Sequence, residues 1–98
     1  MIESVDEPTV RVRILVAGRV QGVGFRAFAA RAATQLHLVG GVRNLDDGRV
    51  ELHVEGNRMA IEGLLHELKT GPPAAQVATI TTEWSTANGR YSNFSIWR

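Results

Sequence analysis

The spacing of hydrophobic and polar residues predicts seven elements in the order strand, helix, strand, strand, helix, strand, strand. In the segment Val10–Ala17, apolar residues alternate with Arg11 and Arg13, which is the period of a strand with one buried face. A hairpin turn signal, Asp47-Gly48, separates the second strand from the third. The other strands are expected at residues 39–44, 49–55, 77–84 and 94–97.

Two segments have the apolar spacing of amphipathic helices. In the first, Phe25–Leu36, apolar residues recur three or four positions apart. The second follows Asn57, a residue type favoured at the N-cap, and ends at Gly71, which two prolines follow. Its apolar stripe comprises Ile61, Leu64, Leu65 and Leu68.

The third strand is expected to have one apolar and one polar face. In the third strand the apolar face comprises Val50, Leu52 and Val54. The opposite face, with Glu51, His53 and Glu55, is expected to be wet. In the fourth strand one face comprises Ala78, Ile80, Thr82 and Trp84.

Two helices with one apolar face each, and a sheet with one polar face, predict a two-layer α+β sandwich with both helices on the same side. The split β-α-β arrangement, also called ferredoxin-like, meets this requirement, with an extra short strand at the C-terminus. Right-handed crossovers place the third strand between the first and the second. The C-terminal ends of the first two strands then lie on one edge of a mixed, mainly antiparallel sheet.

The composition fits one domain and excludes several kinds of site. We expect a flexible lead-in over residues 1–9 and one domain over residues 10–98. The chain has no cysteine, which excludes disulfides, thiolate nucleophiles and cysteine-ligated metals. Acidic residues stand where a signal peptide has basic ones, and no apolar run has the length of a membrane span. We therefore expect a cytoplasmic monomer with no membrane partner.

The charge of the chain gives no reason to expect nucleic acid as a partner. The formal net charge is only +1, so the overall field is weak. Ten of the eleven basic residues are arginines, which suit phosphate recognition but are also explained by a genome-wide bias in residue use. Only the position of a particular arginine can therefore indicate a function.

The segment Gly18–Gly24 has three glycines and leads into the first predicted helix, as in an anion-binding loop. Arg26 lies in the first turn of that helix, where a cation opposes the helix dipole unless an anion is bound. Asn44 ends the second strand on the same edge, and its amide can align a water molecule. The alternatives are an ordinary tight turn with a solvated arginine, and an asparagine that only starts a hairpin.

Other types of site find less support in the sequence. The loop lacks the spacing and the Lys-Ser/Thr pair of a Walker loop and does not fit a dinucleotide fingerprint. His37, His53 and His66 are widely spaced, so surface positions are expected for them and no metal site. Asp46 and Asp47 are best explained by the hairpin turn. No metal and no cofactor is therefore expected.

Two longer motifs resemble those of a known family. The segment Ala17–Arg26 is similar to the acylphosphatase signature that follows the first strand, and Gly41–Glu51 is similar to the second signature. Similarity continues through Gly71–Pro73 and Phe94–Ile96, so that it covers nearly the whole chain. This chain departs from the family at Gly41, where an aromatic residue is frequent, and at Gly56-Asn57, where Gly-Pro is frequent.

The resemblance implies a ferredoxin-like fold and hydrolysis of acyl phosphates, without a metal, a cofactor or a covalent intermediate. In this reading Arg26 and Asn44 are catalytic: Arg26 holds the phosphate and Asn44 positions the water. The phosphate-binding loop comprises Gln21, Gly22, Val23, Gly24, Phe25 and Arg26. The expected partner is a small acyl phosphate, with inorganic phosphate or another oxyanion as an alternative occupant of the loop.

Two other functions remain open at this point. The same fold occurs in RNA-recognition domains, although these need exposed aromatics on the central strands. The first and third strands here have none, and the strand aromatics are Trp84, Phe94 and Trp97. An accessory domain that binds acyl phosphates without turnover is the second alternative, against which Arg26 and Asn44 argue.

Overall fold

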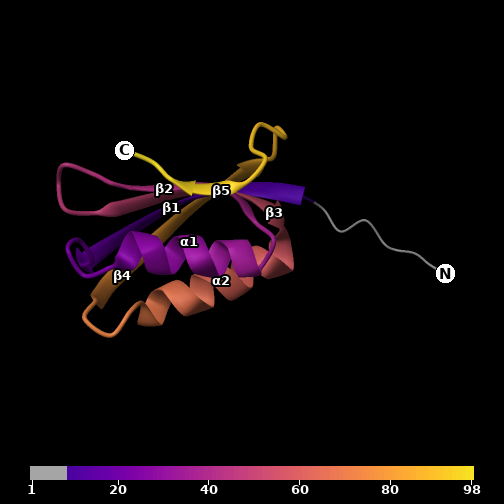
Figure 1. The fold of residues 1–98 in the computed structure, drawn as a ribbon. Helices are drawn as coiled ribbons and strands as arrows, with labels where there is room; N and C mark the ends of the chain where they lie inside the picture. Colours follow the sequence, from indigo (N-terminus) through magenta and orange to yellow (C-terminus); the bar gives the residue numbers. More distant parts are fainter. Residues whose placement is uncertain (1–8) are drawn as a thin grey trace.

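The computed structural model describes residues 9–98, which form a five-stranded sheet with both helices packed on one face (Figure 1). The α+β sandwich with a ferredoxin-like arrangement is confirmed. Residues 1–8 of the expected lead-in lie outside the described residues, and Thr9 already belongs to the first strand. The elements are β1 (Thr9–Arg19), α1 (Phe25–Gln35), β2 (Val39–Asn44), β3 (Val50–Asn57), α2 (Arg58–Thr70), β4 (Gln76–Thr86) and β5 (Phe94–Ile96).

The strand order β4-β1-β3-β2-β5 brings the ends of β1 and β2 to one edge of the sheet. β3 pairs antiparallel with both β1 and β2, so that β1 and β2 run in the same direction on either side of it. The predicted position of the third strand, between the first and the second, is therefore confirmed. The strand β5 pairs in parallel with β2 and extends the sheet at that end.

The hydrophobic core lies between the sheet and the two helices. The alternating apolar residues of β1, Val12, Ile14 and Val16, are fully buried, as are Val50, Leu52 and Val54 of β3. The stripe of α2 faces them through Ile61, Leu64 and Leu68, while Leu65 is only partly buried. Burial of each such side chain contributes about 1.5–3 kcal/mol to stability. The small alanines of α1 allow close packing on the sheet.

Several element boundaries differ from the prediction by one or two residues, and one of these differences accompanies a change of register. β1 continues past Gly18 to Arg19, with a shift of register between Ala17 and Gly18. Because of that shift Ala78 is exposed and Val77 packs against the core together with Ile80 and Trp84, so the prediction that Ala78 shares their face is wrong. A bulge of this kind inserts one extra residue into a strand, and the alternation of apolar residues in the sequence does not reveal it.

The second helix begins as predicted, at Asn57. The Oδ1 atom of Asn57 accepts hydrogen bonds from the backbone N–H groups of Met59, at 2.7 Å, and Ala60, at 3.2 Å. An asparagine cap thus starts the helix where proline is frequent in the family. No helix within residues 9–98 combines the length and the apolarity that crossing a membrane requires.

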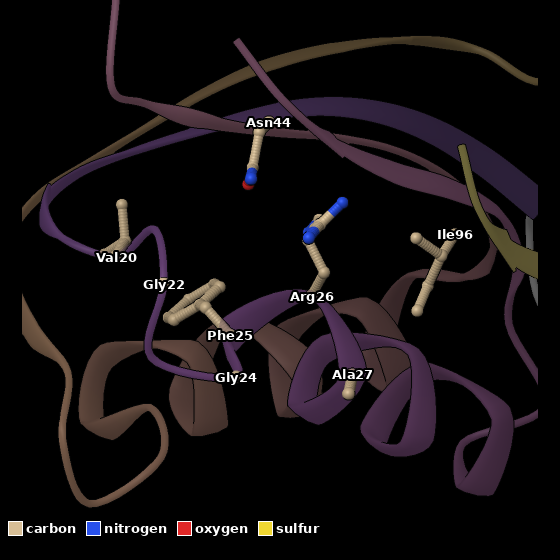
Figure 2. Close-up of a pocket in the computed structure, with 8 residues that line it drawn as sticks. All are labelled: Val20, Gly22, Gly24, Phe25, Arg26, Ala27, Asn44 and Ile96. Atoms are coloured by element: carbon tan, nitrogen blue, oxygen red, sulfur yellow. The ribbon is translucent and has the colours of Figure 1, made fainter. Parts of the chain in front are cut away.

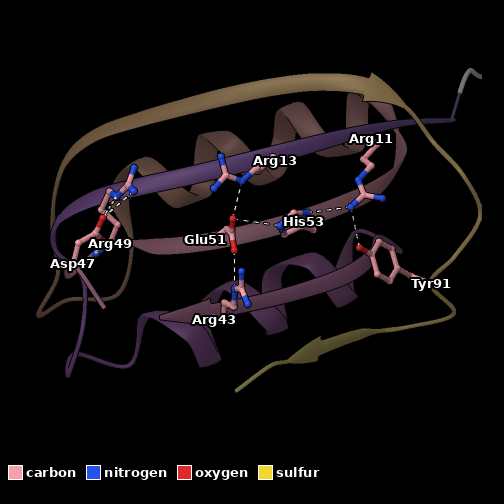
Figure 3. A network of polar contacts seen from close by, with 8 residues as sticks. All are labelled: Arg11, Arg13, Arg43, Asp47, Arg49, Glu51, His53 and Tyr91. Atoms are coloured by element: carbon pink, nitrogen blue, oxygen red, sulfur yellow. Dashed lines mark hydrogen bonds and ion pairs between the residues drawn. The ribbon is translucent and has the colours of Figure 1, made fainter. Parts of the chain in front are cut away.

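The expectation of a wet outer face on β3 is wrong for its two glutamates, of which only 2% is exposed in each case. Glu51 lies between Arg13 and Arg43 of the neighbouring strands, each of which donates a hydrogen bond of 2.7 Å to it (Figure 3). Glu55 accepts from the backbone N–H groups of Asn88, at 3.2 Å, and Gly89, at 3.1 Å. Arginine side chains and the loop before β5 therefore cover these carboxylates.

On the outer face of the sheet, the neighbours of Glu51 and His53 shift the pKa values of both side chains. Burial alone raises the pKa of Glu51, but hydrogen bonds from Arg13 and Arg43 outweigh it and hold the pKa below its ordinary value. His53 lies 3.4 Å from Glu51, and Arg11 reaches both His53 and Tyr91. Burial lowers the pKa of His53, which the nearby Glu51 only partly offsets.

Gly41, the first departure from the family pattern, lies directly against Trp97. A Cβ atom at this position would overlap the indole ring. The backbone N–H of Trp97 donates to the carbonyl of Val42 at 2.7 Å, which holds the ring in place. An aromatic side chain from the end of the chain therefore fills the space beside Gly41.

Candidate active site

A pocket of about 220 Å³ lies on the edge where β1 and β2 end beside the start of α1 (Figure 2). It is lined by the loop after β1, the first turn of α1, the last residue of β2 and one residue of β5. These residues are Val20, Gly22, Gly24, Phe25, Arg26, Ala27, Asn44 and Ile96.

The start of α1 presents unpaired backbone N–H groups to this pocket. Gly24 is the N-cap residue in the left-handed conformation (φ 82°), and no side chain caps the helix. The N–H of Phe28 donates to the carbonyl of Gly24 at 3.1 Å, so the N–H groups before it have no acceptor within the helix. A Cβ at Gly24 would meet no atom within 4 Å, so the backbone angle is what favours glycine here. Such a helix start binds anions.

Arg26 adds a full positive charge to the same place. It lies in the first turn of α1, which has no acidic residue, and its side chain is exposed. Within residues 9–98 no carboxylate forms an ion pair with it. Figure 2 shows Arg26 extending from α1 toward the strand that carries Asn44. The conflict between this cation and the helix dipole, expected from the sequence, is thus not relieved by any side chain of the described part.

Asn44 faces Arg26 across the pocket, extending into it from the end of β2 (Figure 2). Its Oδ1 atom is buried, and no donor among residues 9–98 reaches it. A buried acceptor without a partner costs about 1–3 kcal/mol, and most such groups in proteins are paired. The Asn44 amide thus has an acceptor that the described residues leave unused.

The arrangement combines a group of donors suited to an anion, at the start of α1, with the neutral acceptor of Asn44. Backbone N–H groups and a guanidinium can hold a phosphoryl group, since both supply only donors. The Asn44 amide can accept from a water molecule but cannot take its proton. Within the described residues, no group of three histidine, aspartate or glutamate side chains is placed as metal ligands would be.

The structure brings most of the predicted site residues together. Gly22, Gly24, Phe25 and Arg26 line the pocket together with Asn44. Gln21 and Val23 do not line it. The side chain of Gln21 is directed at the β2–β3 hairpin, and Val23 packs against the core.

Three pocket residues were not predicted from the sequence: Val20, Ala27 and Ile96. Val20 and Ala27 adjoin the predicted loop and are apolar, so their type gave no signal of a site. Ile96 comes from β5, and its place beside β2 depends on a pairing between strands far apart in the sequence.

The hairpin after Asn44 closes in the way that the turn signal predicts. The N–H of Leu45 donates to the carbonyl of Arg49 at 2.8 Å. Asp47 accepts from the backbone N–H of Arg49 at 3.1 Å and from its Nε at 2.9 Å. Hydrogen bonds from the Arg49 side chain and backbone lower the pKa of Asp47. Asp47 therefore serves the turn, and its partner is within the hairpin.

The three histidines are scattered. His37 and His66 are exposed, as expected, and His53 belongs to the cluster on the outer face of the sheet. None of them lines the pocket.

Comparisons with known proteins agree with the two motifs. The family model described as acylphosphatase matches residues 12–96. An acylphosphatase of Methylococcus capsulatus is 48% identical over 88 residues, which is 90% of this chain and 96% of that protein. The crystal structure of acylphosphatase from Bacillus subtilis has a TM-score of 0.88 and 40% identity, covering 91% of this chain and 99% of that one. An acylphosphatase structure from Coxiella burnetii has a TM-score of 0.85 and 37% identity, covering 92% of this chain and 94% of that one.

Proposed function

Because this chain belongs to the acylphosphatase family and hydrolyses acyl phosphates, we propose that Arg26 binds the phosphoryl group and that Asn44 orients the attacking water. The observation that carries the proposal is the buried, unpartnered Oδ1 atom of Asn44, which faces Arg26 across one pocket. In this proposal the Asn44 Oδ1 atom accepts a hydrogen bond from the attacking water, next to the place where the phosphoryl group binds.

In this proposal the phosphoryl oxygens accept hydrogen bonds from the Arg26 guanidinium and from the backbone N–H groups of the Gln21–Arg26 loop. Gly22 and Gly24 have positive φ values of 74° and 82°, a backbone conformation that occurs where successive N–H groups form an anion-binding concavity. These donors stabilise the charge that spreads over the phosphoryl oxygens in the transition state. Inorganic phosphate, the product, has the same oxygens and binds in the same loop.

Asn44 accepts a hydrogen bond from the water and directs its oxygen at phosphorus, in line with the bond that breaks. A bond forms between the water oxygen and phosphorus, and the bond from phosphorus to the acyl oxygen breaks. The carboxylate leaves with the electron pair. One proton of the water stays on the phosphate hydroxyl that forms, and the other passes to a phosphoryl oxygen or to solvent. Because a carboxylate is a good leaving group, positioning and charge stabilisation are sufficient, and neither a general acid nor a metal is needed.

We also propose that residues 10–98 act as one domain and that the protein works as a cytoplasmic monomer. The continuous core and the absence of cysteine support this, since cysteine-free chains suit a reducing compartment. Light scattering on the purified protein measures its mass against the 10.7 kDa of one chain.

The test is benzoyl phosphate hydrolysis in excess chelator by the wild type and by the variants Arg26→Ala and Asn44→Ala. Each loss should cost roughly 3–4 kcal/mol, or on the order of a hundred- to a thousandfold in turnover. Arg26→Ala should weaken both substrate binding and turnover, whereas Asn44→Ala should mainly lower turnover. Arg31→Ala is the matched control, because Arg31 is exposed on the same helix but does not line the pocket.

The division of roles is checked separately with inorganic phosphate, by titration calorimetry. Arg26→Ala should lose phosphate binding and Asn44→Ala should keep it. Equal loss of affinity in both variants with intact turnover contradicts the proposed roles, and loss of activity in Arg31→Ala shows that the assay reports folding or net charge.

A further inference from the structure

We propose that Gln21 is a positioning residue that holds the phosphate-binding loop at a fixed distance from Asn44. This inference rests on the proposed roles of Arg26 and Asn44. It assigns to the Gln21 side chain a function other than contact with the substrate, since that side chain does not line the pocket.

The side-chain amide of Gln21 joins two segments that are distant in the sequence. Its Nε2 atom donates to the carbonyl of Leu45 at 2.8 Å and to the carbonyl of Arg49 at 2.9 Å. These carbonyls belong to the two ends of the hairpin that begins directly after Asn44. Both N–H bonds of the amide are thereby used, and the opposite orientation would direct the amide oxygen at two other oxygens. The orientation of the side chain is therefore fixed.

The hairpin does not need Gln21 in order to close. The carbonyl of Leu45 already accepts from the N–H of Gly48 at 3.2 Å, and the carbonyl of Arg49 accepts from the N–H of Leu45 at 2.8 Å. Removal of the Gln21 amide thus leaves neither carbonyl without a partner, so the large cost of an unpaired buried group does not arise. The two bonds contribute mainly by fixing one segment relative to the other.

This connection matters because the phosphate-binding loop and Asn44 belong to strands that are not neighbours in the sheet. Arg26 is on α1 and Asn44 is on β2, while β3 separates β2 from β1, to which the loop is attached. The Gln21 side chain spans this separation next to the pocket. In-line attack is sensitive to alignment, and a misplacement of about 1 Å can lower the rate roughly a hundredfold.

The test compares Gln21→Met and Gln21→Glu with the wild type. Methionine keeps the length of the side chain and removes the donors, and glutamate keeps its shape but presents acceptors to the two carbonyls. For both variants we expect kcat for benzoyl phosphate to fall by roughly 10- to 100-fold. For Gln21→Met the affinity for inorganic phosphate should stay within about threefold, since phosphate contacts only the loop, and the melting temperature should fall by less than about 5 °C.

Asn57→Ala is the matched control for stability. It removes the cap of α2 at the end of β3 farthest from Asn44, so it should lower the melting temperature by a similar amount with kcat unchanged. The inference is overturned if both Gln21 variants keep the wild-type kcat, or if Asn57→Ala loses kcat in proportion to its stability. Retained turnover in Arg26→Ala and Asn44→Ala contradicts the proposed function instead, which keeps the two failures distinct.

Discussion

Replacement of Glu51 by glutamine removes one negative charge from the outer face of the sheet and keeps the shape of the side chain. In the wild type the carboxylate is 2% exposed and accepts hydrogen bonds of 2.7 Å from Arg13 and from Arg43. In the variant one end of the side chain is an amide NH₂ group that faces a guanidinium, so one of the two bonds is lost. The remaining bond loses the charge of its acceptor. We expect a clear loss of stability with no change in the fold.

The magnitude follows from the strength and the exposure of these contacts. Hydrogen bonds to charged groups contribute about 1.5–3 kcal/mol each, which gives about 3–6 kcal/mol for two. Solvent reduces this value, because the side chains of Arg13 and Arg43 are 38% and 45% exposed and become hydrated when the carboxylate is lost. Half of the sum, about 1.5–3 kcal/mol, is the expected decrease in the free energy of unfolding. That decrease corresponds to roughly 7–15 °C in the melting temperature of a domain of this size.

The assay is urea unfolding of both proteins, followed by tryptophan fluorescence, at pH 7 and at several values down to pH 3. The pKa of Glu51 is lowered in the folded protein relative to its ordinary value of 4.5. Its contribution to stability is therefore complete above pH 4.5 and is lost as the pH falls through the folded pKa. The difference between the wild type and Glu51→Gln should shrink over that range.

The control for this experiment is the same change on an exposed ion pair. Glu62→Gln disrupts the pair with Arg58 on α2, in which both side chains are 56% exposed. It should alter the free energy of unfolding by less than about 0.5 kcal/mol. Our reasoning is refuted if Glu51→Gln is as stable as the wild type at pH 7, or if the difference between the two proteins stays constant down to pH 3.

Three further changes test other parts of the structure. Asn44→Leu replaces the unpartnered amide by an apolar side chain of similar shape, so turnover should fall on the order of a hundred- to a thousandfold while urea unfolding shows no loss of stability. Gly41→Ala places a methyl group where the ring of Trp97 lies, and it should cost about 1–3 kcal/mol and change the tryptophan emission; unchanged stability and emission speak against this contact. Burial lowers the pKa of His53 from 6.5, so the neutral form is favoured in the folded protein and the wild type loses stability as the pH falls from about 6.5 toward the folded pKa. His53→Gln should flatten that part of the pH profile, and an unaltered profile excludes the assignment.

The sequence was sufficient to place Arg26 and Asn44 on one edge. Apolar periods identified the strands and helices, and the handedness of the crossovers then set the order of the first three strands. With the third strand between the first and the second, β1 and β2 run in the same direction. Their ends, at Arg19 and Asn44, must therefore lie at the same edge of the sheet. Both steps depend on local patterns and a general rule, so no contact between particular side chains was needed.

The wet outer face was predicted wrongly because alternation gives the direction of a side chain and not what covers it. The sequence correctly directed Glu51 and Glu55 away from the core. Their burial depends on the register that sets Arg13 and Arg43 opposite Glu51, and on the loop that brings Asn88 over Glu55.

By itself, then, the sequence determined the fold class, and it predicted an anion-binding loop with Arg26 and Asn44 beside it from local patterns of residues. Only the tertiary structure decided that Gln21 joins the loop to the hairpin, that Ile96 lines the pocket and that Asn44 Oδ1 has no partner within the described residues. These three facts depend on distances of a few ångströms between segments 20 or more residues apart, which no local pattern of residues encodes.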